Sequence, residues 1–134
     1  MKKIEVVAAV LEDGDKILAT KRGHGEFAGL WEFPGGKIEQ NESQKEALRR
    51  EIMEELDAEI EVGDFITTVE YDYPTFHLTM HCYFCINKNG ILNLNEHADA
   101  IWLELDNLYS VEWIPADIGV VEKILEMKRV AYKK

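Results

Sequence analysis

A glycine pair followed by a helix, within residues 35–58, constrains this chain more than any other stretch. Ser43 and Glu46 have the spacing of a capping box, which predicts that the helix begins near Gln44 and ends near Leu56. An apolar stripe on this helix consists of Leu48, Ile52 and Leu56. Such a stripe can seat the helix on a hydrophobic core.

Three glutamates would lie together on another side of the helix. Glu51, Glu54 and Glu55 are at i, i+3 and i+4 and therefore project on one face. Like charges so placed repel by roughly a few tenths of a kcal/mol per pair, unless a cation lies between them. A divalent ion would be such a cation, and carboxylates without nearby His or Cys favour Mg²⁺ or Mn²⁺ over zinc. The alternative, a solvated acidic face, is the commoner meaning of such a cluster.

Gly35 and Gly36 shift the balance toward a metal site. They allow a positive φ and close approach of the backbone, which would place carbonyl or N–H groups beside the acidic face. Arg50 is expected to point away from that face and to brace the helix through Glu46 and Glu54.

The segment resembles the signature of the Nudix hydrolases, enzymes that cleave nucleoside diphosphates linked to another group. The matching pattern is Gly36, five residues, Glu42, seven residues, then Arg50-Glu51-Ile52-x-Glu54-Glu55. The resemblance implies metal ligation by the three glutamates with a carbonyl of Gly35 or Gly36. One departure is Asp57, where the family usually has Gly. Asp can also enter the left-handed conformation that this Gly would adopt.

Size and charge limit the other possibilities. At 134 residues the chain is expected to form a single domain, 1–134. No apolar run approaches the roughly 18 residues of a membrane span, and no signal peptide is evident, so we expect a cytoplasmic protein. The net charge of −11 argues against a polymeric nucleic acid as partner, whereas a small nucleotide could be bound with a metal ion. The sequence leaves monomer and homodimer open.

Hydrophobic patterning predicts a mixed β-sheet between helices. The expected strands cover residues 4–11, 16–20, 31–33, 60–71, 77–86, 91–94 and 101–105. Gly63 and Asp64 would interrupt the fourth strand, and residues 106–113 would be irregular or briefly helical. A last helix begins at Pro115, with apolar positions at Ile118, Val121, Ile124 and Leu125. This pattern fits helices on both faces of one sheet, and the resemblance implies the same α/β/α Nudix fold.

Cys82 and Cys85 have the spacing of a zinc-binding pair, with His77 and His81 nearby. In a strand, however, side chains alternate between the two faces, so the two thiols would point in opposite directions. The segment is therefore interpreted as an ordinary strand.

Further candidates come from a resemblance to the MutT-like branch of the Nudix family. In that branch a loop glutamate, here Glu96, contributes to the metal site or to activation of water. Lys37 corresponds to a lysine that supports the departing charge, and Arg22 lies in a basic loop from which it could reach a phosphate or the base. The simpler interpretation of all three is an exposed side chain.

Asp117 is the candidate for reading the nucleotide base. It could simply complement the dipole of the last helix. In MutT-like enzymes, however, an Asn at this place both donates and accepts toward an oxidised guanine. An ionised Asp only accepts, which would favour the exocyclic amine of cytosine or adenine, and a protonated Asp would blur that preference. The pocket walls are expected to include Tyr73, Phe76 and Leu78, which could equally be core residues.

Together these features favour a Mg²⁺-dependent pyrophosphohydrolase that converts a nucleoside triphosphate to a monophosphate and pyrophosphate. The chain looks most like bacterial enzymes that act on CTP, and 5-methyl-dCTP would be a related substrate. Glu51, Glu54 or Glu96 would accept the proton from water. A second hypothesis is sanitisation of oxidised purine triphosphates such as 8-oxo-dGTP or 2-hydroxy-dATP. A third is a nucleotide-binding module without catalysis.

Overall fold

Two long strands that pair in parallel form the centre of the structure. The computed structural model describes residues 1–132. Strand β1 (Lys2–Asp13) runs beside β6 (Phe76–Asn87), with Lys2 opposite Phe76 and Glu12 opposite Ile86. The two strands come from distant parts of the sequence, so this pairing joins the two halves of the chain.

The other strands extend this pair into one sheet. They are β2 (Lys16–Lys21), β3 (Trp31–Glu32), β4 (Gly35–Lys37), β5 (Ile60–Asp72) and β7 (Asp99–Glu104). The order is β3-β2-β1-β6-β5, and in addition β4 pairs with β1 and β7 pairs with β2. These further pairings are antiparallel. The sheet is therefore mixed, as the sequence predicts.

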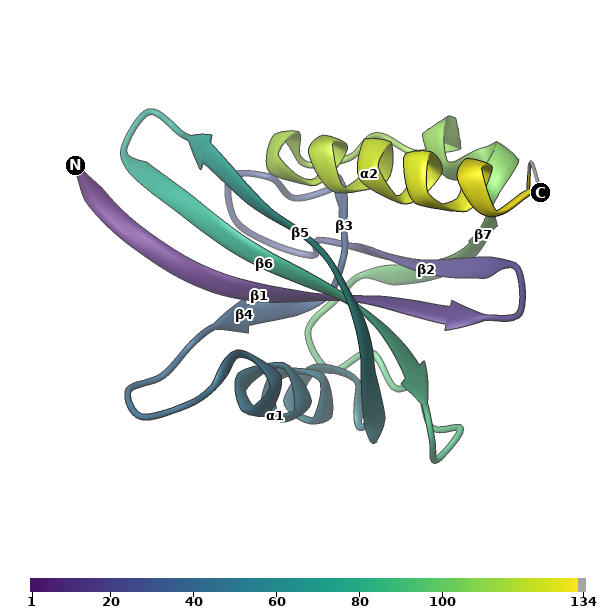
Figure 1. Cartoon of the computed structure of the whole chain (residues 1–134). Helices are drawn as coiled ribbons and strands as arrows, with labels where there is room; N and C mark the ends of the chain where they lie inside the picture. The colour runs from purple at the N-terminus through teal and green to yellow at the C-terminus, as the bar shows by residue number, and fades with distance from the viewer. Residues whose placement is uncertain (133–134) are drawn as a thin grey trace.

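Helices cover both faces of the sheet (Figure 1). Helix α1 (Gln44–Leu56) lies on one face, while α2 (Pro115–Tyr132) and the short 3₁₀ helix η1 (Leu105–Ser110) lie on the other. Side chains of β1 alternate between the two cores: Val7 and Ala9 pack in the α1 cluster, Ala8 and Val10 in the α2 cluster. The predicted α/β/α architecture is confirmed.

Helix α1 has the predicted bounds and caps. Ser43 Oγ accepts a hydrogen bond from the Glu46 N–H at 3.1 Å, and the Glu46 carboxylate accepts one from the Ser43 N–H at 3.0 Å. Asp57 ends the helix in the left-handed conformation, with φ 57°. The whole predicted apolar stripe is buried: Leu48, Ile52 and Leu56.

Three local predictions are wrong. Residues 91–94 form no strand, because the chain after Asn87 runs to the end of α1, where the Asn93 N–H donates to the Leu56 carbonyl at 2.8 Å. Gly63 does not interrupt β5, which continues through an irregular register between Val62 and Thr67. Ile118 faces solvent with 41% of its surface exposed. The core side of α2 includes Val120, Val121, Ile124 and Leu125.

The two cysteines point to opposite faces of β6, as alternation predicts. Cys82 is buried in the core under α2 and Cys85 in the core under α1. Burial raises the pKa of both thiols above their usual value. In residues 1–132, no helix has the length and apolar character needed to span a membrane.

Candidate active site

The three glutamates of the predicted metal site, all in α1, differ in their exposure. Glu55 is buried with 6% of its surface exposed, whereas the side chains of Glu51 and Glu54 are 17% and 58% exposed. The acidic side of α1 therefore extends from the interior of the protein to the solvent.

Arg50 lies among these acids, so the expectation that it points away from them is wrong. Its guanidinium donates to Glu42 at 2.6 and 2.9 Å and to Glu51 at 2.9 Å. It also lies 3.4 Å from a carboxylate oxygen of Glu54 and donates to the Lys37 carbonyl at 3.0 Å. Arg50 thus links the helix to the turn before it and to β4.

This arrangement changes the electrostatic argument for a metal ion. The hydrogen bond from Arg50 lowers the pKa of Glu42 to about 2, and the same contact raises the pKa of Arg50 above its usual value. The guanidinium lies between Glu51 and Glu54 and therefore offsets the repulsion between the two carboxylates. We expected a divalent cation to do this. The acidic cluster is therefore compatible with folding before any ion binds.

The glycine pair is a strand, and its role differs from the prediction. Gly35 and Gly36 lie in β4 opposite Ala8 and Val7 of β1, and neither has a positive φ. A Cβ at Gly35 would overlap the Val7 carbonyl oxygen, and a Cβ at Gly36 would overlap the Glu51 carboxylate. Glycine is needed here for space: it lets α1 bring Glu51 directly against the backbone of β4.

Glu55 is the most perturbed acid of the cluster. Burial first, and then the charges of Glu51, Glu96 and Glu32, raise its pKa to about 9, while a backbone hydrogen bond with Gly35 opposes the shift. Its Oε2 atom is buried and has no hydrogen-bond partner. Buried polar atoms normally have a partner, so this oxygen indicates a place for a proton or a cation.

The loop that carries Glu96 is fastened to the carboxyl end of α1. The Asn95 N–H donates to the Glu55 carbonyl at 3.0 Å, and the Asn93 N–H donates to the Leu56 carbonyl at 2.8 Å. Glu96 is exposed, and its charge contributes to the raised pKa of Glu55. The structure thus brings the predicted loop glutamate to the acidic helix.

Glu32 also belongs to this acidic group, and sequence reasoning missed it. Its Oε2 lies 3.7 Å from Nε of Arg22 and 3.4 Å from Nε2 of His97. His97 is nearly buried, with an Nδ1 atom that has no partner. The available signal was a charged residue between two aromatic residues, just before the glycines.

The donor set fits a hard divalent ion. All candidate side-chain ligands are carboxylates, one buried oxygen of Glu55 is without a partner, and Gly36 leaves room for Glu51. In residues 1–132, no three His, Cys, Asp or Glu side chains already lie close enough together to hold an ion. Since Glu51 and Glu54 are turned to Arg50, an ion would compete with the guanidinium for them.

A pocket of about 260 Å³ begins beside the glycine pair and crosses to the α2 side of the sheet. Gly35, Gly36 and Lys37 line one part, and Ile114, Ala116 and Asp117 line another. All five predicted substrate-binding residues contribute to its wall: Arg22, Tyr73, Phe76, Leu78 and Asp117. The structure therefore brings these candidates together, while Glu51, Glu54, Glu55 and Glu96 lie outside the pocket lining, around α1.

Asp117 is buried at the α2 part of this pocket. Its Oδ2 accepts a hydrogen bond from the Phe33 N–H at 2.8 Å. Burial is the main cause that raises the pKa of Asp117 to about 8, and the Phe33 hydrogen bond only partly opposes it. The raised pKa favours the neutral form, which is the protonated case that blurs the preference predicted for an ionised Asp.

Aromatic rings form a second wall of the pocket. Tyr73 stacks on Phe76 with ring centroids 5.0 Å apart, and Phe27 contacts Tyr73 at 5.4 Å. The Tyr73 hydroxyl accepts a hydrogen bond from the Ala116 N–H at 3.1 Å, next to Asp117. These contacts fix a flat apolar surface beside a polar group, as a nucleotide base requires.

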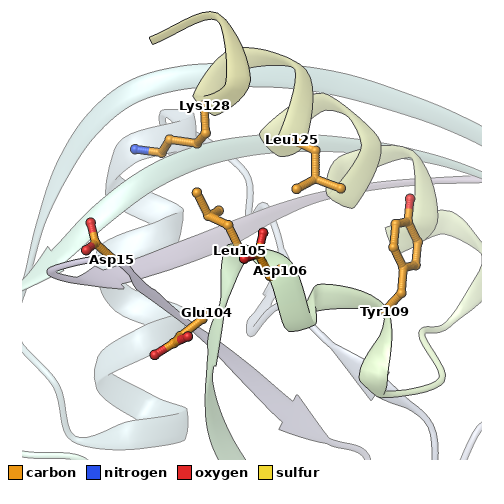
Figure 2. Close-up of a pocket in the computed structure, with 7 residues that line it drawn as sticks. All are labelled: Asp15, Glu104, Leu105, Asp106, Tyr109, Leu125 and Lys128. Atoms are coloured by element: carbon orange, nitrogen blue, oxygen red, sulfur yellow. The ribbon is translucent and has the colours of Figure 1, made fainter. Parts of the chain in front are cut away.

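A larger cavity, of about 590 Å³, lies elsewhere between the β1–β2 turn, β7, η1 and α2 (Figure 2). Its lining comprises Asp15, Glu104, Leu105, Asp106, Tyr109, Leu125 and Lys128. None of the predicted site residues line it. Lys128 is engaged with Glu12 at 2.7 Å, so the one lysine of the lining already has a partner.

Comparisons with known proteins show which sequences are similar to this chain. A family model described as the NUDIX domain matches residues 1–123. The CTP pyrophosphohydrolase of Escherichia coli K12 is 36% identical over 129 residues, which cover 96% of each chain. The 8-oxo-dGTP diphosphatase of the same organism is 28% identical over 126 residues, 92% of this chain and 98% of that one.

A solved structure is similar over nearly the whole chain. The solution structure of the E. coli ORF135 protein superposes with a TM-score of 0.86 at 36% identity. The match covers 96% of this chain and 92% of that one.

Proposed function

We propose a function from one premise: this chain belongs to the NUDIX family of hydrolases. It is a nucleotide hydrolase, and Nudix hydrolases generally need a divalent metal. The proposed reaction is the hydrolysis of a nucleoside triphosphate to a monophosphate and pyrophosphate, with CTP and 5-methyl-dCTP as favoured substrates.

One observation carries this proposal: a single pocket connects the glycine strand at the acidic helix to Asp117. A triphosphate at Gly35–Lys37 would lie next to the acidic helix, and its base would reach the stacked rings and the buried carboxyl group. A module that only binds nucleotides would not need acidic residues beside the phosphates. This pocket opens beside all three of the predicted metal ligands, Glu51, Glu54 and Glu55.

Glu51, Glu54 and Glu55, with a carbonyl of Gly35 or Gly36, would hold the ion, and Glu96 lies near them. Bound Mg²⁺, or Mn²⁺, would neutralise phosphate oxygens and lower the pKa of a water molecule. Arg50 holds Glu42 and orients the outer acids.

Around that site, exposed charged groups would take part in the reaction. Glu54 or Glu96, which are exposed, or Glu51 would accept the proton of the attacking water. Lys37 and Arg22 line the pocket and supply positive charge for the phosphates. With a net charge of −11, the protein is suited to small nucleotides rather than to polymeric nucleic acids.

A neutral Asp117 is still compatible with a cytosine base. A protonated carboxyl group donates one hydrogen bond and accepts another, which matches the ring nitrogen and amine of cytosine. The resemblance to a CTP pyrophosphohydrolase over 96% of the chain supports the same substrate. A neutral acid also resembles the amide of an Asn, and relatives act on 8-oxo-dGTP, so oxidised purine triphosphates are the second candidates.

Pyrophosphate release tests the proposal directly. CTP, 5-methyl-dCTP, 2-hydroxy-dATP and 8-oxo-dGTP are compared by kcat/KM, with and without Mg²⁺. We expect Mg²⁺-dependent release, highest with the cytosine nucleotides, and loss of most turnover in Glu54→Gln with the fold retained. A lead for 8-oxo-dGTP would reverse the substrate order, and binding without turnover would indicate a non-catalytic module.

A further inference from the structure

Asp57 occupies a position that is unfavourable for aspartate for two reasons. It ends α1 in the left-handed conformation, with φ 57° and ψ 17°, which glycine adopts without strain. Its negative charge also lies at the carboxyl end of the helix, where the dipole favours cations. The backbone cap, an Asp57 N–H bond to the Met53 carbonyl at 3.0 Å, needs no side chain.

The side chain of Asp57 instead holds the neighbouring loop. Its Oδ2 accepts a hydrogen bond from Nδ2 of Asn93 at 3.0 Å, and its Oδ1 accepts one from Nδ2 of Asn95 at 3.2 Å. Both carboxylate oxygens are therefore engaged by two residues of one loop. The Asn95 side chain also donates to the Glu54 carbonyl at 2.9 Å.

This loop ends in the residue that the proposed reaction uses. Glu96 directly follows Asn95, whose N–H is bonded to the Glu55 carbonyl. On the other side of Glu96, the Ala98 N–H donates to the Lys21 carbonyl at 2.9 Å. The loop is thus tied on both sides of Glu96, and Asp57 accepts two of the side-chain bonds of the first tie.

We propose that Asp57 is a positioning residue, which clamps Asn93 and Asn95 so that Glu96 stays beside the acidic side of α1. The inference rests on the proposed function, because it assigns Glu96 a part in that reaction. It explains why an unfavourable residue is present where glycine would satisfy the helix end.

Asp57→Gly tests the clamp, because it keeps the helix end and removes only the side-chain bonds. We expect hydrogen exchange of the 92–98 amides to become faster in the metal-free protein, without a loss of thermal stability. With CTP and saturating Mg²⁺, kcat should fall about 2- to 10-fold, the range of a net hydrogen bond, with KM unchanged. Asp57→Asn tolerates the left-handed conformation and keeps one acceptor oxygen, so it should restore part of both properties.

Two comparisons separate positioning from general loosening. In a Glu96→Gln background, Asp57→Gly should cause no further loss of kcat, since the residue that it positions is already gone. The matched control is Asn89→Ala, which removes the 3.2 Å bond to the backbone carbonyl of Asp57 and the 3.1 Å bond that Asn89 Oδ1 accepts from the Ile91 N–H, and which leaves the carboxylate bonds of Asp57 intact. This control should keep wild-type kcat and wild-type exchange in 92–98.

The outcomes distinguish the clamp from the proposed function. Unchanged exchange, or faster exchange with wild-type kcat, would overturn the positioning role. An additive loss in the Glu96→Gln background would also overturn it. If the wild-type protein turned over no nucleotide, the proposed function would fail, and the positioning role with it, whereas faster exchange would still demonstrate the contact.

Discussion

Glu55 and Asp117 are both buried carboxyl groups with raised pKa values, yet they lie on opposite faces of the sheet in different surroundings. Glu55 has a buried oxygen without a partner and is surrounded by other acids. Asp117 accepts a hydrogen bond from the Phe33 N–H, and the charges of Glu32 and Arg22 act on its pKa in opposite directions. The first site is suited to a cation, and the second to an uncharged group that both donates and accepts hydrogen bonds.

Burial alone therefore does not define the role of a carboxyl group. A carboxyl group surrounded only by like charges gains most from a metal ion, whereas one whose neighbouring charges oppose each other gains most from a neutral partner. Changes at Glu55 should therefore affect turnover and changes at Asp117 should affect base choice, each largely without the other.

The largest effect is expected for Glu55→Gln. An amide removes the negative charge that a divalent ion needs, so kcat with Mg²⁺ should fall by at least about 100-fold. The ratio of kcat/KM for CTP and 8-oxo-dGTP should stay at the wild-type value. A pyrophosphate assay with both nucleotides measures this, and an altered ratio would contradict the separation of the two sites.

The second largest effect concerns how the stability of the protein depends on pH. Both carboxyl groups have a folded pKa above the unfolded value, about 9 against 4.5 for Glu55 and about 8 against 3.8 for Asp117. Their contribution is therefore fully present below the unfolded values, falls steadily as the pH rises above them, and is completely lost once the pH has passed the folded values. In metal-free buffer at pH 7, Glu55→Gln and Asp117→Asn should each raise the free energy of unfolding by about 1–3 kcal/mol relative to the wild type.

Urea unfolding between pH 4 and 8 checks this, and the gain should vanish near pH 4. The matched control is Glu54→Gln, whose side chain is largely exposed and should show no such pH dependence. Parallel curves for wild type and the two buried variants would mean that the carboxyl groups are ionised in the folded state.

Base choice should respond to Asp117→Asn by about 10-fold. An amide keeps a donor and an acceptor but fixes their positions, which should move the kcat/KM ratio from CTP toward 8-oxo-dGTP. The Mg²⁺ concentration for half-maximal activity should not change. A shifted Mg²⁺ requirement with an unchanged nucleotide ratio would reverse the roles that we assign to the two carboxyl groups.

The smallest effect is expected for Arg50→Gln. Removing the guanidinium leaves Glu51 and Glu54 without their cation and should lower the free energy of unfolding by about 1 kcal/mol in metal-free buffer. Excess Mg²⁺ should reduce this loss, because the ion replaces the missing charge. Equal losses with and without Mg²⁺, measured by urea unfolding, would argue against an ion at this cluster.

Local signals explain what the sequence could predict. The bounds of α1 follow from a capping box and a four-residue apolar period, which act within a few residues of each other. The acidic residues, the pocket wall around Asp117 and the divergence of the two cysteines follow from helix and strand periodicity together with a family resemblance.

The errors come from contacts between distant residues. Gly35 and Gly36 are needed because Val7 lies against the first and Glu51 against the second. No local sequence pattern indicates these two contacts. Arg50 contacts Glu42 because the turn before α1 folds back on the helix. Glu32 lies near Glu55 because the sheet brings β3 close to the acidic side of α1. Residues 91–94 form no further strand, because the Asn93 N–H bonds to a carbonyl at the end of α1, a partner that strand alternation does not indicate.

The parallel pairing of β1 with β6 has a consequence for how the protein is made. During synthesis β1 leaves the ribosome first, but its partner across the sheet, from Phe76 onward, follows only after more than half of the chain. Until then the central strand has one unpaired edge exposed, which invites aggregation. Folding should therefore be slow, in the roughly millisecond-to-second range of domains with many distant contacts, and should wait until β6 has been synthesised.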